Sequence, residues 1–178
     1  MKASFSWPVV ISSALLLSLS ILVIYSSSHE LALQQAVFAM LGFIIFFILS
    51  SIDYRYLKNF IYSAYFVTLI LLVFVFILGI ETRGSVRWIS LGFINIQPSE
   101  LIKPVIIYLL ALFWSNHIPS WRNILLSLFW ILPALLLIFR QPDLGTTLTI
   151  LAIWSGILFA ARISFKKITG LLITFLLN

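Results

Sequence analysis

The sequence contains no cysteine and little charge. The absence of cysteine among its 178 residues excludes disulfide-stapled scaffolds, thiol catalysis and cysteine-ligated metals within this chain. Charged residues make up only 9% of the chain, whereas a soluble domain carries about 25%. Hydrophobic residues account for 62%, and the mean hydropathy is +1.17. The core of a soluble domain cannot bury so large an apolar fraction, so the sequence predicts an integral membrane protein.

Acidic residues are especially scarce, with 5 against 11 basic ones, which gives a net charge of +6. The basic residues stand singly at the ends of apolar runs and do not form one polar face. That distribution disfavours a nucleic-acid partner. The chain has no phosphate-binding glycine loop, no nucleotide motif and no metal-ligand spacing, so we expect neither a cofactor nor a metal.

The apolar runs predict an all-α, polytopic membrane bundle. Runs of sufficient length, separated by charged or turn residues, predict six complete spans. They cover residues 7–25, 31–51, 59–80, 97–115, 124–139 and 143–161. The first run lacks a small-residue cleavage site, so we expect a retained helix and not a signal peptide. No long linker divides the chain, which predicts a single transmembrane domain over residues 1–178.

A seventh apolar run begins near Ile168 and reaches Asn178. A membrane span needs about 20 residues, and this run is much shorter. We therefore expect a truncated seventh helix, in a chain that is the N-terminal portion of a longer protein.

The distribution of lysine and arginine predicts a cytoplasmic N-terminus. In this orientation seven basic residues flank the spans on the inner side, namely Lys2, Arg55, Lys58, Arg122, Arg162, Lys166 and Lys167. Three lie on the outer side, namely Arg83, Arg87 and Arg140. Cytoplasmic connections of membrane proteins carry the excess of basic residues, so the seven-to-three ratio favours this orientation.

The connection after the third span, ETRGSVRWISLGFINIQPSELIK, concentrates charge in an otherwise apolar chain. Arg83 and Arg87 lie four residues apart, and Trp88 follows as an interfacial anchor. Guanidinium groups at the outer membrane surface suit a lipid-linked phosphate. An equally open interpretation is that both arginines only solvate the loop or touch anionic lipid.

Two similar motifs, QPSELIK and QPDLGTT, open the fourth and the sixth spans. Glu100 and Lys103 lie three residues apart on one helix face and can pair. Asp143 opens the other span from the same side of the membrane, so we expect one cluster in which Lys103 bridges both carboxylates. Gln97 and Thr146 complete this polar set. Intramembrane ionisable groups are often functional, but a purely structural ion-pair network is the alternative.

These motifs resemble the SEDS family, to which RodA, FtsW and SpoVE belong. The match runs from about residue 84 to 147, and the short NHIPSW connection favours the rod-shape branch. The matching positions are Gly84, Arg87, Trp88, Gly92, Gln97, Pro98, Ser99, Glu100, Lys103, Gln141, Pro142, Asp143, Leu144, Gly145 and Thr146.

The resemblance implies a bacterial plasma-membrane protein of about ten helices. Its implied activity is peptidoglycan glycosyl transfer, in which lipid II is polymerised and undecaprenyl pyrophosphate leaves, with a class B penicillin-binding protein as partner. In the family, the proposed catalytic aspartate lies in an outer loop that would follow Asn178. We therefore expect no catalytic residue in this chain, and no activity of the chain alone.

Two other functions remain open at this point. A transporter of lipid-linked precursors would also open helices with charge near the membrane, but the fourth span is apolar beyond Lys103 except at Tyr108. A non-catalytic membrane scaffold that docks the penicillin-binding protein is the other alternative.

Overall fold

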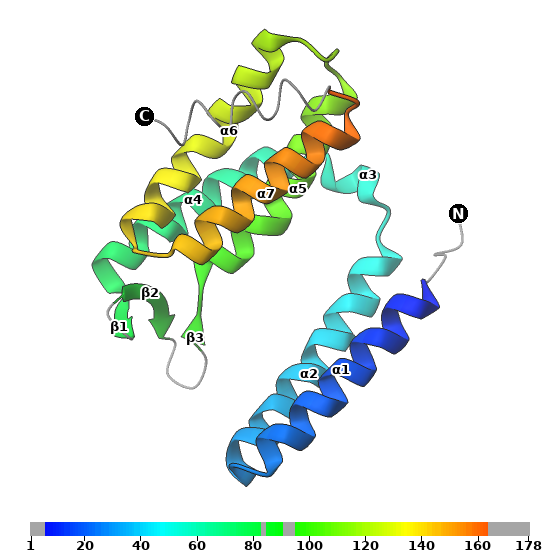
Figure 1. Cartoon of the computed structure of the whole chain (residues 1–178), viewed down its shortest axis with the longest axis vertical. Coiled ribbons are helices and arrows are strands. Elements are labelled where there is room, and N and C mark those ends of the chain that lie inside the picture. Colours follow the sequence, from blue (N-terminus) through cyan, green and yellow to red (C-terminus); the bar gives the residue numbers. More distant parts are fainter. Residues whose placement is uncertain (1–5, 83–84, 91–94, 164–178) are drawn as a thin grey trace. The chain divides into compact units, whose positions relative to one another are not determined.

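The computed structural model describes residues 6–82, 85–90 and 95–163, and the chain divides into two compact units (Figure 1). Unit 1 comprises Met1–Leu57 and unit 2 comprises Lys58–Asn178. The single transmembrane domain over residues 1–178 stays a prediction. The truncated seventh helix after Ile168 lies outside the described residues.

Unit 1 is a pair of long helices in contact, followed by one helical turn. Helix α1 covers Trp7–Tyr25, helix α2 covers His29–Ser51 and helix α3 covers Tyr54–Leu57. Ser28 caps α2, because its side chain accepts a hydrogen bond from the Leu31 N–H at 3.4 Å. Among the described residues of this unit only Ala32 is buried. A helix pair this exposed and this apolar requires lipid or other protein around it.

Unit 2 packs four helices, with a small sheet at one end (Figure 1). The helices are α4 (Ile61–Leu78), α5 (Pro98–Ser115), α6 (Trp121–Arg140) and α7 (Leu144–Ala160). Local chemistry explains where three of them begin. Pro98 occupies the first turn of α5, where its missing N–H costs nothing. The side chains of Ser120 and Asp143 accept backbone hydrogen bonds from Asn123 and Thr146, and thereby cap α6 and α7.

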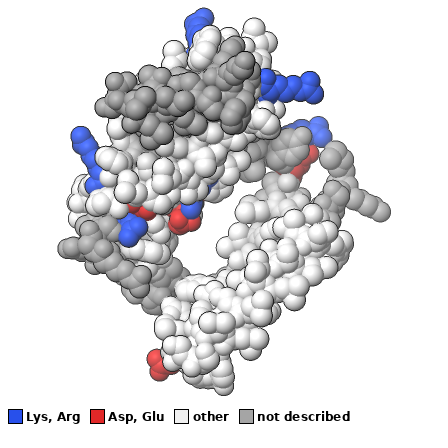
Figure 2. Space-filling view, viewed as in Figure 1, with Lys and Arg blue, Asp and Glu red and all other residues white. Residues whose placement is uncertain are grey.

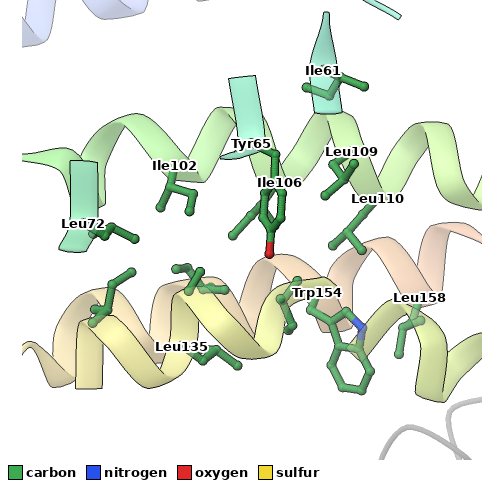
Figure 3. Close-up of a cluster of buried hydrophobic side chains, with 14 of the residues drawn as sticks. Ile61, Tyr65, Leu72, Ile102, Ile106, Leu109, Leu110, Leu135, Trp154 and Leu158 are labelled. Carbon is green, nitrogen blue, oxygen red and sulfur yellow. The ribbon is translucent and has the colours of Figure 1, made fainter. Parts of the chain in front are cut away.

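The core of unit 2 is apolar and contains two buried polar links between helices (Figure 3). The Tyr65 hydroxyl of α4 donates a hydrogen bond to the Trp130 carbonyl of α6. The buried Trp154 indole of α7 donates to the Ser127 hydroxyl of α6 at 3.0 Å. Fully enclosed aliphatic side chains surround these links, among them Leu72, Ile102, Ile106, Leu109, Leu110, Ile131, Ile138 and Leu158.

Two helices of unit 2 contain an internal proline. Pro104 lies within α5 and Pro133 within α6. Proline has no N–H, so the carbonyls four residues earlier, those of Glu100 and Phe129, lose their usual intrahelical donor.

The charged connection after α4 contains a three-stranded antiparallel sheet where the sequence analysis placed only a loop. Its strands are β1 (Ile80–Thr82), β2 (Ser85–Ser90) and β3 (Asn95–Ile96), in the order β1-β2-β3. Pairing of Thr82 with Ser85 places β1 and β2 in a tight hairpin, and Ile89 pairs with Ile96. Strand β2 also contacts α4 and α5, so the sheet is fixed against the bundle.

The six predicted spans correspond to α1, α2, α4, α5, α6 and α7, with boundaries displaced by at most three residues. Within the described residues, α1, α2, α5 and α6 are long and apolar enough to cross a membrane. The apolar segments Ile61–Ile77 of α4 and Leu144–Ala160 of α7 are shorter than these four helices. The predicted all-α membrane bundle is thus confirmed, with the small sheet as an addition.

Removing the hydroxyl of Ser127 should destabilise unit 2. In Ser127→Ala the buried indole N–H of Trp154 loses its acceptor, and we expect a loss of about 1–3 kcal/mol in unfolding free energy. Ser155→Ala is the matched control on α7, since within the described residues that hydroxyl donates to the Leu151 carbonyl of its own helix and to no other helix. Equal unfolding midpoints for the two variants in detergent would show that the interhelical bond contributes nothing.

Candidate functional site: the polar cluster at the sheet end

The buried carboxylate of Asp143 is the centre of the polar cluster. Asp143 is 5% exposed and stands immediately before α7. Its Oδ1 accepts from the Thr146 N–H at 3.1 Å, and its Oδ2 accepts from the Thr146 hydroxyl at 2.9 Å. These bonds fix the carboxylate rotamer and cap the helix at its positive end.

Two further segments of unit 2 reach the same carboxylate. From β2, Arg87 Nη1 lies 3.4 Å from Asp143 Oδ1. From the residue before α5, Gln97 Nε2 lies 3.4 Å from Asp143 Oδ2 and 3.0 Å from Ser99 Oγ. Asp143 therefore connects the sheet, the start of α5 and the start of α7 through one side chain.

Arg87 neutralises Asp143 and has further donors. Its side chain is 28% exposed. Its Nε is enclosed and has no hydrogen-bond partner within the part of the chain that the structure describes. A guanidinium carries five N–H donors, and within the described residues the contact with Asp143 engages Nη1.

Glu100 and Lys103 form a separate pair on α5. Lys103 Nζ lies 2.7 Å from both Glu100 oxygens, Oε1 and Oε2. The Glu100 side chain is 54% exposed and that of Lys103 is 22% exposed on this unit. Glu100 thus lies on an open face of α5, Lys103 is largely covered by unit 2, and Ile102 and Ile106 face the core.

The predicted bridge from Lys103 to both carboxylates is wrong. Lys103 pairs with Glu100, and the cation beside Asp143 is Arg87. The physical reason is the sheet: the sequence analysis treated Arg87 as part of a loop, but β2 carries it against the start of α7. The predicted cluster therefore consists of two ion pairs.

The remaining predicted site residues are Gln97, Thr146 and Arg83. The structure brings Gln97 and Thr146 to Asp143, as described above. Arg83 lies outside the described residues. Gln141, which the sequence analysis used only as part of a motif, is 2% exposed and donates from Nε2 to the Leu72 carbonyl at 3.1 Å. The repeated Gln-Pro pair before α5 and α7 was the sequence feature that could have predicted this structural role of Gln141.

On the face that Figure 2 draws, charged side chains of the described residues are few, and most of the helical surface is uncharged. Among the described residues no group of three or more His, Cys, Asp or Glu side chains is arranged to hold a metal ion. The cluster offers one lysine and one arginine at the sheet end of unit 2, and these cations suit an anionic ligand such as a phosphate ester.

The sequence itself matches a known family model along almost its full length. The model FTSW_RODA_SPOVE, described as "Cell cycle protein", matches residues 3–178. The chain belongs to this family. The resemblance inferred from the QPSELIK and QPDLGTT motifs is thereby confirmed. As a member of this family, the chain is a multi-pass protein of the bacterial inner membrane.

Curated relatives carry names from this family. The chain is 38% identical over 151 residues to "Peptidoglycan glycosyltransferase MrdB" of Helicobacter pylori, and the alignment covers 80% of this chain and 39% of the relative. It is 30% identical over 158 residues to MrdB of Escherichia coli K12, covering 86% of this chain and 43% of the relative. A "Probable peptidoglycan glycosyltransferase FtsW" of Trichlorobacter lovleyi is 35% identical over 167 residues, covering 82% and 43%. The chain thus spans 39–43% of these relatives.

Solved structures share the fold. The rod shape determining protein RodA of Thermus thermophilus superimposes with a TM-score of 0.85 at 26% identity, over 98% of this chain and 59% of RodA. A chain from a structure described as "Structural coordination of polymerization and crosslinking by a peptidoglycan synthase complex" gives 0.87 at 26% identity, over 98% and 53%.

Loss of the Asp143 side chain should destabilise unit 2 more than loss of the Glu100 charge. Asp143→Ala removes the α7 cap and leaves Arg87 unpaired, for which we expect a cost of about 2 kcal/mol or more. Glu100→Gln breaks an exposed pair and should change stability by at most about 1 kcal/mol. Thermal unfolding of both variants in the same detergent measures the difference. A Glu100→Gln variant as unstable as Asp143→Ala would contradict this assignment.

Double-mutant cycles should divide the cluster into its two pairs. We expect a coupling energy above about 0.5 kcal/mol between Glu100 and Lys103, and likewise between Arg87 and Asp143. Combinations across the pairs, such as Glu100→Gln with Asp143→Asn, should be additive within about 0.5 kcal/mol. Coupling between Lys103 and Asp143 as large as that within a pair would restore the single bridged cluster.

Proposed function

We propose that this chain is the N-terminal portion of a peptidoglycan glycosyltransferase of cell-wall elongation, which polymerises lipid II into glycan strands. The main support for this proposal is the family match over residues 3–178, together with relatives that are named peptidoglycan glycosyltransferases. The likeness to RodA favours the rod-shape branch. The membrane topology of this proposal has the N-terminus in the cytoplasm and the polar cluster at the outer side.

In this proposal the Glu100–Lys103 pair faces the substrate. A lysine that faces lipid costs on the order of 3 kcal/mol at the membrane centre and less near the interface, so the 22% of the Lys103 side chain that unit 2 leaves exposed should meet protein, water or ligand. Lys103 exchanges Glu100 for a pyrophosphate oxygen of the lipid-linked substrate, and Glu100 keeps the ammonium in place beforehand. Arg83 and the free donors of Arg87 supply further contacts to phosphate.

The buried pair has a different role in the proposal. Asp143, with Arg87, Gln97 and Thr146 around it, positions the first turn of α5 and thereby Lys103. These residues support the site without touching the reacting atoms.

The chemistry itself requires groups outside this chain. A sugar 4-hydroxyl attacks the anomeric carbon of the polymer-linked sugar, and the bond from that carbon to the pyrophosphate oxygen breaks. The hydroxyl proton passes to a base, and undecaprenyl pyrophosphate leaves. By the family resemblance, that base is an aspartate beyond Asn178. A class B penicillin-binding protein is the proposed partner, which is consistent with the synthase complex among the similar structures.

A transporter of lipid-linked precursors is the second candidate. The first two turns of α5 carry Glu100 and Lys103, but the remainder of that helix lines the core with Ile106, Leu109 and Leu110. A substrate path to the inner surface would need polar side chains there, so this function ranks below the polymerase. A scaffold that only docks the penicillin-binding protein is the third.

Loss of the Lys103 ammonium should strongly reduce polymerisation without unfolding the protein. In the complete protein with its penicillin-binding partner, we expect Lys103→Met to lower lipid II polymerisation about a hundredfold, as when one preorganised charge contact is lost. Lys58→Met, on an exposed lysine at the start of unit 2, is the control and should retain full activity.

The competing functions predict different results in the same vesicles. Passage of lipid II across the membrane without polymer would establish the transporter. Co-purification of the penicillin-binding protein with an intact but inactive complete protein would establish the scaffold. Full polymerisation by Lys103→Met would remove Lys103 from the proposed site.

A further inference from the structure

A cavity lies at the end of unit 2 remote from the polar cluster. It has a volume of about 360 Å³ and is formed by the last turns of α5 and α7 and the connection to α6. Its lining includes Ala111 and Trp114 of α5, His117 of the connection, and Ile157 and Ala160 of α7. In the predicted orientation this end of the bundle lies at the inner membrane surface.

The wall of the cavity suits a hydrocarbon chain. Small side chains at Ala111 and Ala160 leave the room, while Trp114 and Ile157 provide apolar surface. Tryptophan is typical of the membrane interface, where its ring lies at the level of the lipid head groups. An occupant of this cavity therefore has an apolar part and ends at the interface.

His117 places a fixed polar group at the rim. Its ring stacks on Phe113 with centroids 4.1 Å apart and an interplanar angle of 12°. Its Nδ1 lies 2.7 Å from the Phe113 carbonyl. A carbonyl only accepts, so Nδ1 carries the proton in this contact, and Nε2 has no hydrogen bond within the described part of the chain. Nε2 can donate to an anion only when it also carries a proton.

The surroundings of the cavity are basic. Arg162 directly follows the lining residue Ala161, and Arg122 lies three residues after the lining residue Pro119. Both arginines are exposed. Basic side chains stand out at the end of unit 2 where α6 begins and α7 ends (Figure 2). Exposed arginines at the inner surface attract anionic lipid head groups.

We propose that this cavity binds one anionic phospholipid of the inner leaflet. An acyl chain occupies the space beside Ala111 and Ala160, and the phosphate lies at the rim near His117, at the end of the bundle that carries Arg122 and Arg162. This site is independent of the polymerase site at the other end of the bundle.

Filling the cavity should remove the bound lipid. The full chain, purified in detergent and mixed with phosphatidylglycerol, is analysed by native mass spectrometry for retained lipid. We expect retention by the wild type and by Ala152→Phe, an exposed position on α7 away from the cavity, and loss of retention in Ala160→Phe. Ala111→Phe on α5 tests the same cavity if Ala160→Phe has a lowered unfolding temperature. Equal retention by the filled and control variants would overturn the proposal.

The head-group preference should depend on the two arginines. Phosphatidylcholine with the same acyl chains should be retained less than phosphatidylglycerol. Arg122→Gln and Arg162→Gln should each lower this preference about fivefold, which corresponds to about 1 kcal/mol per surface arginine. Arg140→Gln, at the opposite end of α6, is the matched control and should leave it unchanged. Equal retention of both lipids by the wild type, or displacement by free glycerol phosphate, would overturn an anionic phospholipid as the occupant.

Discussion

The arrangement of unit 2 at the sheet end depends on one buried carboxylate. Asp143 accepts from the Thr146 N–H and hydroxyl and lies against Arg87 and Gln97. A buried, ionised carboxylate is tolerated only when it is paired and hydrogen-bonded. These contacts come from three parts of the chain, so satisfying one charge requires the sheet, the start of α5 and the start of α7 to meet.

The two ion pairs divide structural and functional demands between them. The Arg87–Asp143 pair is largely enclosed, and breaking it exposes an uncompensated charge to a dry environment. In the Glu100–Lys103 pair the carboxylate side chain is 54% exposed and the lysine side chain 22% exposed, so the attraction is screened mainly on the carboxylate side. The Arg87–Asp143 pair thus fixes the start of α5, and the neighbouring Glu100–Lys103 pair supplies the ammonium that we propose binds the anionic substrate.

Sequence reasoning recovered the helices because their signal is long and redundant. About twenty apolar residues in succession predict a span, and Pro98 and Asp143 marked two of the helix starts. The sheet was missed because its strands contain at most six residues. The available signal was Gly84 between two short segments of alternating character. The missed sheet also caused the error at Lys103, since only the strand brings Arg87 to Asp143.

The proline at position 104 changes how the site is connected to the helix that carries it. Because Pro104 cannot donate to the Glu100 carbonyl, the turn with Glu100 and Lys103 has one fewer backbone link to the rest of α5. The orientation of that turn then relies on side-chain contacts at Gln97 and Ser99. The charged turn is therefore held in place by its side chains, with buried Ser99 and Ile102 on one side of the Glu100–Lys103 pair, more than by the backbone ladder of its own helix.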